Sequence, residues 1–152
     1  MHPHSDDPLQ RLEPLVGAWS LEAVFPGAPP SDLRGRLTFE WLPGGGFLVQ
    51  RWEVPVPEAP DGIALIGFHR DRGTFLQHYF DTRAVARVYE MGFEGGVWTL
   101  SRTEPDFSPL DFRQRWTGTL SPDGDAITGR WEICHDGVTW EHDFELRYQR
   151  LS

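Results

Sequence analysis

The sequence predicts an all-β protein: a single closed antiparallel meander barrel of about ten strands, preceded by a short N-terminal helix. From Gly17 onward, apolar and polar residues alternate with the period of two that is typical of half-buried strands. Turn-forming glycine and aspartate residues interrupt this alternation at roughly 8–12-residue intervals, the spacing of an all-β domain. A meander of this length is expected to close, because an open sheet edge favours aggregation. A two-sheet sandwich is the structural alternative.

The only helical pattern lies near the N-terminus. Leu9 and Leu12 are three residues apart, Pro8 suits a first helical position, and Pro14 favours a stop. We expect one or two turns of helix across one end of the barrel, with the leucines closing that end. Residues 1–7 are expected to be disordered.

The strands follow in order, each with one mainly apolar face. In the first of them, Trp19, Leu21 and Ala23 share a face. The expected strands cover residues 17–25, 36–42, 47–54, 63–70, 74–81, 84–93, 97–102, 111–120, 126–134 and 138–149. Tight turns join several pairs through Gly-Gly or Asp-Gly, which tolerate the positive φ that hairpin turns need. Three longer proline-containing connections, residues 26–32, 55–61 and 103–110, are expected to cap the barrel mouths.

Composition limits the function classes. The 152 residues fit one domain, residues 1–152, and the net charge of −9 argues against a nucleic-acid partner. The single cysteine, Cys134, excludes an intrachain disulfide and is compatible with a reducing compartment. Because no signal peptide or membrane-spanning apolar run is evident, we expect a cytoplasmic protein without a membrane partner. A homodimer remains open.

The start of the chain resembles a known family of barrels. The stretch Leu12-Glu13-Pro14-Leu15-Val16-Gly17-Ala18-Trp19 is similar to the opening of lipocalin-like (calycin) barrels, in which a short helix precedes Gly-x-Trp. In those families an arginine near the chain end packs over that tryptophan, which implies Arg147 or Arg150 here. Further stretches resemble a bacterial group of such barrels with no assigned function: residues 39–48, 79–81, 89–91, 129–132 and 136–140. The resemblance implies the fold and carries almost nothing about function.

Nitrobindins, which are haem-binding barrels of the same size, resemble the chain more distantly. The sequence keeps Gly17-x-Trp19 but continues with Ser20-Leu21-Glu22, so the longer glycine-repeated opening motif of nitrobindins is broken. A haem is therefore a cofactor only in an alternative interpretation of the sequence.

His142 is the first candidate site residue. The alternation of the last strand places Trp140, His142 and Phe144 on one face. Because the other residues of this face are apolar, we expect it to point inward. An interior histidine could ligate a haem iron, act as an acid or base, or anchor a ligand. A core histidine that hydrogen-bonds to a neighbour is the alternative.

Polar residues that share the inward parity are the second group of candidates. Gln114 alternates with Trp116, Arg87 alternates with Tyr89, and Arg51 lies on one of two equally apolar faces of its strand. Buried polar groups are costly unless they are paired, so these residues imply pairing, water or a ligand. An interior arginine favours an anionic head such as a carboxylate, and an internal Arg–Glu pair is the alternative. The predicted ligand-binding residues are therefore His142, Gln114, Arg87, Tyr89, Trp116, Trp140 and Arg51.

No catalytic motif is present, so the sequence leaves enzymatic activity open. It lacks a Gly-x-Ser-x-Gly nucleophile motif and a phosphate-binding loop, and the pair His69 and His78 lacks a third metal ligand with defined spacing. The leading hypothesis is a binding barrel for a small hydrophobic or amphipathic molecule. Two others stay open: a haem-binding or small enzymatic barrel that uses His142, and an interaction module with a solid core.

Overall fold

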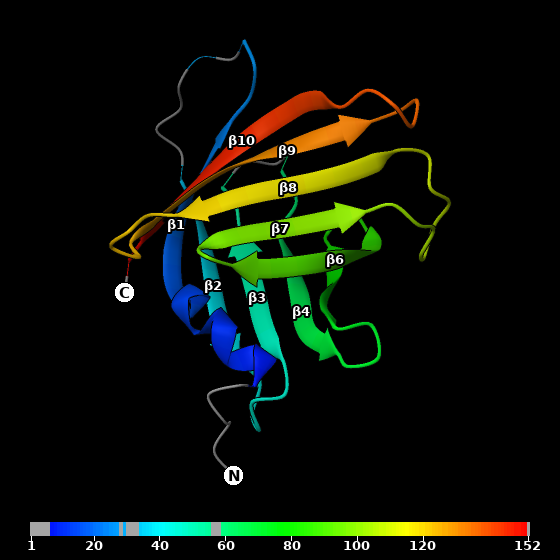
Figure 1. The fold of residues 1–152 in the computed structure, drawn as a ribbon. Coiled ribbons are helices and arrows are strands. Elements are labelled where there is room, and N and C mark those ends of the chain that lie inside the picture. The colour runs from blue at the N-terminus through cyan, green and yellow to red at the C-terminus, as the bar shows by residue number, and fades with distance from the viewer. Residues whose placement is uncertain (1–6, 28, 30–33, 56–58, 152) are drawn as a thin grey trace.

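The chain forms a closed antiparallel barrel of ten strands, which confirms the predicted fold class (Figure 1). The computed structural model describes residues 7–27, 29, 34–55 and 59–151. Outside the described residues lie 1–6, 28, 30–33, 56–58 and 152. They include most of the stretch 1–7 that was expected to be disordered and parts of two connections expected to cap the barrel, 26–32 and 55–61. The strands are β1 (Gly17–Val24), β2 (Gly35–Trp41), β3 (Leu48–Glu53), β4 (Gly62–His69), β5 (Thr74–Asp81), β6 (Ala86–Glu94), β7 (Val97–Arg102), β8 (Arg113–Leu120), β9 (Ala126–Cys134) and β10 (Glu141–Arg150).

Each strand pairs with the next one along the chain, and β1 pairs with β10 to close the barrel. The tight turns carry the predicted glycines; Gly95 and Gly96, for example, have φ values of 60° and 78°. Opposed residues on neighbouring strands point to the same face, so Leu21 and Tyr148, which are partners across the closure, both point inward.

A 3-10 helix, η1 (Pro8–Leu15), covers one end of the barrel, as Figure 1 shows. The Asp7 carboxylate caps it by accepting a hydrogen bond from the Leu9 backbone N–H at 3.1 Å. Leu12 is fully buried and closes this end of the barrel, as predicted, whereas Leu9 is only half-buried against the core. Leu15, which was not predicted to do so, is the second fully buried leucine of the helix.

Trp19 and Arg150 complete the closed end. The indole N–H of Trp19 donates to the Leu15 carbonyl at 3.0 Å, and the Arg150 guanidinium lies 4.2 Å from the centroid of the Trp19 ring. Of the two arginines that the resemblance implied, Arg150 is therefore the one over the tryptophan. Arg147 is exposed and pairs with Glu145.

The core is packed in the half of the barrel next to η1. Its largest buried side chains include Trp19, Phe39, Ile66 and Met91. Within the described residues, no helix is long and apolar enough to cross a membrane.

Candidate functional site: a cavity with polar and apolar walls

A cavity of about 920 Å³ occupies the half of the barrel away from η1. Its mouth lies among residues of the connections at that end, including Phe25, Pro60 and Arg83. Apolar side chains such as Leu37 and Leu146 form part of its wall. This half of the barrel is therefore open to solvent, in contrast to the packed half next to η1.

Aromatic rings line the deep part of the cavity. Trp98 and Trp116 pack edge to face, with centroids 5.4 Å apart and planes at 71°, and Tyr148 contacts both rings. The edge of the Trp116 ring lies against two glycines, because a Cβ at Gly129 would come within 2.5 Å of it and one at Gly118 within 2.7 Å. These two glycines make the room for a large ring on the barrel wall.

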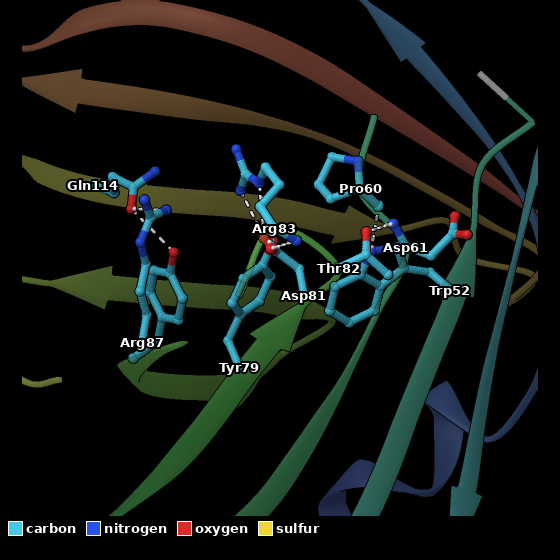
Figure 2. Close-up of polar contacts among 10 residues, drawn as sticks. Trp52, Pro60, Asp61, Tyr79, Asp81, Thr82, Arg83, Arg87 and Gln114 are labelled. Atoms are coloured by element: carbon cyan, nitrogen blue, oxygen red, sulfur yellow. Dashed lines mark hydrogen bonds and ion pairs between the residues drawn. The ribbon is translucent and has the colours of Figure 1, made fainter. Parts of the chain in front are cut away.

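A polar cluster of Arg87, Tyr89 and Gln114 lies on the cavity wall. Figure 2 shows Arg87 beside Gln114. The side-chain oxygen of Gln114 accepts hydrogen bonds from Arg87 Nη1 at 3.1 Å and from the Tyr89 hydroxyl at 3.0 Å. The Arg87 guanidinium also lies 5.6 Å from the ring centroid of Phe112. Within the described part of the chain, Arg87 has no carboxylate partner. Among the described residues, the cluster thus presents a cation that forms no ion pair with a carboxylate.

A second arginine at the mouth is neutralised. Arg83 Nη2 lies 2.6 Å from the Asp81 carboxylate, which also accepts a hydrogen bond from the Tyr79 hydroxyl at 2.6 Å (Figure 2). Burial raises the pKa of Asp81, but the hydrogen bonds from Arg83 and Tyr79 outweigh it and lower this pKa to about 2. Burial and the bond to Asp81 raise the pKa of Tyr79 above its usual value, so its hydroxyl stays a neutral donor.

The interior also holds two glutamines that the sequence did not identify as site residues. Gln77 Nε2 donates to Gln50 Oε1 at 2.8 Å, and both side chains line the cavity. The sequence pattern that could have identified Gln50 is the one that identified Gln114, a polar residue that alternates with apolar ones: Gln50 alternates with Leu48 and Trp52 along its strand. Both faces of β3 are apolar, so the alternation alone could not select the inward one.

Trp52 and Tyr79 connect the glutamines to the mouth. The two rings stack with centroids 5.2 Å apart, and the Trp52 indole N–H donates to the Pro60 carbonyl at 3.1 Å (Figure 2). Asp61 holds the same connection, because its carboxylate accepts from the Val54 backbone N–H at 2.7 Å. Aromatic stacking and hydrogen bonds therefore fix the described end of this connection over the cavity.

Four of the seven predicted site residues line the cavity: Arg87, Tyr89, Gln114 and Trp116. The structure brings the first three together, as described above. That they bind a ligand remains a prediction.

The predicted inward placement of His142 and Trp140 is wrong. A β-bulge leaves Asp143 without a partner in β9, because His142 is opposite Glu132 whereas Phe144 is opposite Trp131. One extra residue in a strand inverts the faces on its far side, so Phe144 points inward and His142 is exposed.

Trp140 instead packs on the outer face of the barrel. The Arg115 guanidinium lies 4.1 Å from its ring centroid and also forms an ion pair with Glu132 at 2.8 Å. The outward direction of Glu132 thus fixes both Arg115 and Trp140 outside the cavity.

Arg51 also lies outside the cavity, contrary to the prediction. It is exposed and forms an ion pair with Glu40, since Gln50 and Trp52 take the inward positions of β3. Alternation along the strand then directs Arg51 to solvent.

The predicted haem ligand, His142, does not reach the cavity. No histidine of the described part of the chain lines the cavity, and His142 is on the outer surface. His69 and His78 do not meet either, because they are opposite Thr74 and Leu65 in the β4–β5 ladder. Among the described residues, no group of three or more histidine, cysteine, aspartate or glutamate side chains could hold a metal ion.

Fold and site together define a closed ten-stranded barrel with an internal, partly polar cavity. No family model matches the sequence, and no curated protein matches it. Among solved structures, the chain is similar to Rv2717c from M. tuberculosis, with a TM-score of 0.62 and 16% identity over 95% of this chain and 98% of that one. A protein of unknown function from the DUF3598 family of Nostoc punctiforme PCC 73102 matches over 99% of this chain and 100% of its own, at 10% identity and a TM-score of 0.28. The likeness to Rv2717c shows a shared fold.

Proposed function

We propose that the barrel binds a small amphipathic molecule whose anionic head pairs with Arg87 and whose apolar body fills the deep cavity. The observation that carries this proposal is the Arg87 guanidinium, which lines the cavity, is partly buried and has no carboxylate partner among the described residues. A partly buried charge is costly unless a counter-charge satisfies it. A carboxylate matches a guanidinium in charge and in planar geometry.

The size and lining of the cavity support the same ligand class. A volume of about 920 Å³ lies within the range of small-molecule sites, which are mostly apolar with a few placed polar groups.

The positions of the polar groups give the ligand an orientation. Arg87 is the second residue of β6 and Gln114 the second residue of β8, and both strands begin at the mouth. Trp98 and Tyr148 lie deeper, towards the packed core. The head therefore lies near the mouth and the apolar body points towards the floor.

Three probes of equal chain length test the role of Arg87: dodecanoate, dodecanol and dodecylamine, titrated by calorimetry and by tryptophan fluorescence. We expect wild-type protein to prefer dodecanoate. Arg87→Gln should weaken dodecanoate binding by about 10–100-fold, the effect of losing hydrogen bonds to a charged group, and leave dodecanol binding unchanged.

Arg51→Gln is the matched control, because it removes the same charge from the outer surface. It should bind all three probes as the wild type does. Equal loss of dodecanoate binding in both variants, or no loss in Arg87→Gln, would refute the assigned head-group site.

A further inference from the structure

We infer that Gln50 and Gln77 form a second polar subsite in the cavity, and that the ligand carries a neutral group there that both donates and accepts a hydrogen bond. A hydroxyl is the smallest such group. The inference rests on the proposed function and narrows its ligand class from plain amphipathic anions to hydroxylated ones.

The barrel wall brings the two glutamines together across a strand. Gln50 is in β3 and Gln77 in β5, and between them β4 contributes Ala64, the cross-strand partner of Gln50. Ala64 is fully buried, and its small side chain leaves space above the strand. The two amides therefore meet over β4, with Gln77 Nε2 and Gln50 Oε1 2.8 Å apart.

This hydrogen bond uses only part of the capacity of the two amides. The NH2 group of Gln50 and the carbonyl oxygen of Gln77 have no partner among the described residues, and neither atom is sealed from the cavity. If oxygen and nitrogen are exchanged in both amides, Gln50 becomes the donor and Gln77 the acceptor of this hydrogen bond. One NH2 group and one carbonyl oxygen are then again left without a partner. The pair thus presents a donor and an acceptor side by side in either assignment.

Because both side chains are largely buried, a ligand group that pairs with these two atoms is stabilising. Gln50 is 6% exposed and Gln77 is 2% exposed, and a buried amide without a partner is destabilising. Two apolar side chains of similar size would fill the same space without that cost. A ligand hydroxyl satisfies both amides at once, since it accepts from the NH2 group and donates to the carbonyl.

The subsite is deeper than the head-group site. Arg87 is opposite Tyr79 in the β5–β6 ladder, and Gln77 is two residues further from the mouth. One strand across and two residues along correspond to roughly 8 Å between the backbones. The hydroxyl therefore belongs in the middle of a chain whose carboxylate is at Arg87.

The test compares dodecanoate with its isomers hydroxylated at carbon 4, 6, 8 or 10, again by calorimetry. We expect wild-type protein to bind at least one isomer about tenfold more tightly than dodecanoate, as one to two net hydrogen bonds in a dry site provide. In Gln50→Leu/Gln77→Leu this preference should vanish, while dodecanoate binds at least as tightly as before. Gln149→Leu, a change on the outer face, should keep the preference.

Two outcomes overturn the inference: no isomer is preferred by the wild type, or the preference survives in the double variant. The comparison of dodecanoate with its hydroxylated isomers on the wild-type protein tests the inference even if the double variant does not fold. If dodecanoate binds and depends on Arg87 but no isomer is preferred, this inference fails alone. If no probe binds at all, the proposed function fails with it.

Discussion

Arg102 and Asp106 form a buried ion pair beside the cavity. Their side chains are only 2% and 5% exposed, and two parallel contacts join them, Nε to Oδ2 at 2.8 Å and Nη2 to Oδ1 at 2.9 Å. Asp106 also accepts from the Val88 backbone N–H at 2.9 Å. A charge pair therefore fixes the connection after β7 to the barrel wall, close to where Arg87 enters the cavity.

This pair makes stability depend on pH. The hydrogen bonds from Arg102 hold the pKa of Asp106 well below its usual range, and they outweigh the opposing effect of burial. Because the folded-state pKa is lower than the unfolded value of about 3.9, the pair contributes fully above that pH. The contribution is lost as the pH falls below it.

Asp106→Asn should therefore reduce the free energy of unfolding at pH 7 by about 3 kcal/mol, because Arg102 keeps a buried charge without its counter-charge. The difference from wild type should shrink as the pH falls from 5 to 3. Urea unfolding at several pH values measures both effects. Asp71→Asn, in an exposed turn, is the control, and its free energy of unfolding should follow that of the wild type at every pH. If the stability difference between Asp106→Asn and the wild type stays constant with pH, the explanation is contradicted.

At the scale of elements, the bulge in β10 decides which residues reach the cavity. Upstream of it, His142 shares the outer face of Glu132; downstream, Phe144, Leu146 and Tyr148 point inward. Asp143 is the extra residue, so removing it leaves a ladder in which His142 and Phe144 keep their partners.

Deletion of Asp143 should therefore be tolerated, with the free energy of unfolding within about 1 kcal/mol of wild type. Deletion of Glu145, in the regular part of the same strand, must invert one side of β10 and should cost more than about 3 kcal/mol or prevent folding. Chemical denaturation of both variants gives the comparison. Equal losses in the two deletions would show that the bulge is not the adjustable point of the strand.

At the scale of the whole molecule, the barrel depends on the pairing of its first and last strands. All other strand pairs are neighbours in the sequence, whereas β1 and β10 come from opposite ends of the chain. Arg150 reinforces this closure: it donates to the carbonyls of Pro14 at 2.6 Å, Val16 at 2.8 Å and Gly124 at 3.0 Å. One side chain thus joins η1, the start of β1 and the β8–β9 turn.

Arg150→Lys should lower the free energy of unfolding by about 2 kcal/mol, because an ammonium group cannot keep the planar contact with Trp19 and the three directed hydrogen bonds together. Arg147→Lys, three residues earlier on the outer face, should stay within about 0.5 kcal/mol of wild type. Thermal and urea unfolding of both variants measure the difference. Similar values for the two would refute the role assigned to Arg150.

The sequence by itself determined the barrel and half of its site. Alternation with period two fixes which residues of a regular strand share a face, and glycine turns fix where each strand ends. Together they gave the ten strands and the closing helix, and they placed Arg87, Tyr89 and Gln114 inside. These are local properties, and each can be predicted from a few neighbouring residues.

Only the tertiary structure decided the remaining positions. The bulge at Asp143 has no signature in the alternation, yet it moved His142 and Trp140 to the outside. In β3 both faces are apolar, so the pairing with β2 and β4 selected Gln50 over Arg51 for the interior. The meeting of Gln50 with Gln77 depends on the register of three strands, because hydrogen-bond partners across a sheet are set by strand pairing and not by sequence distance.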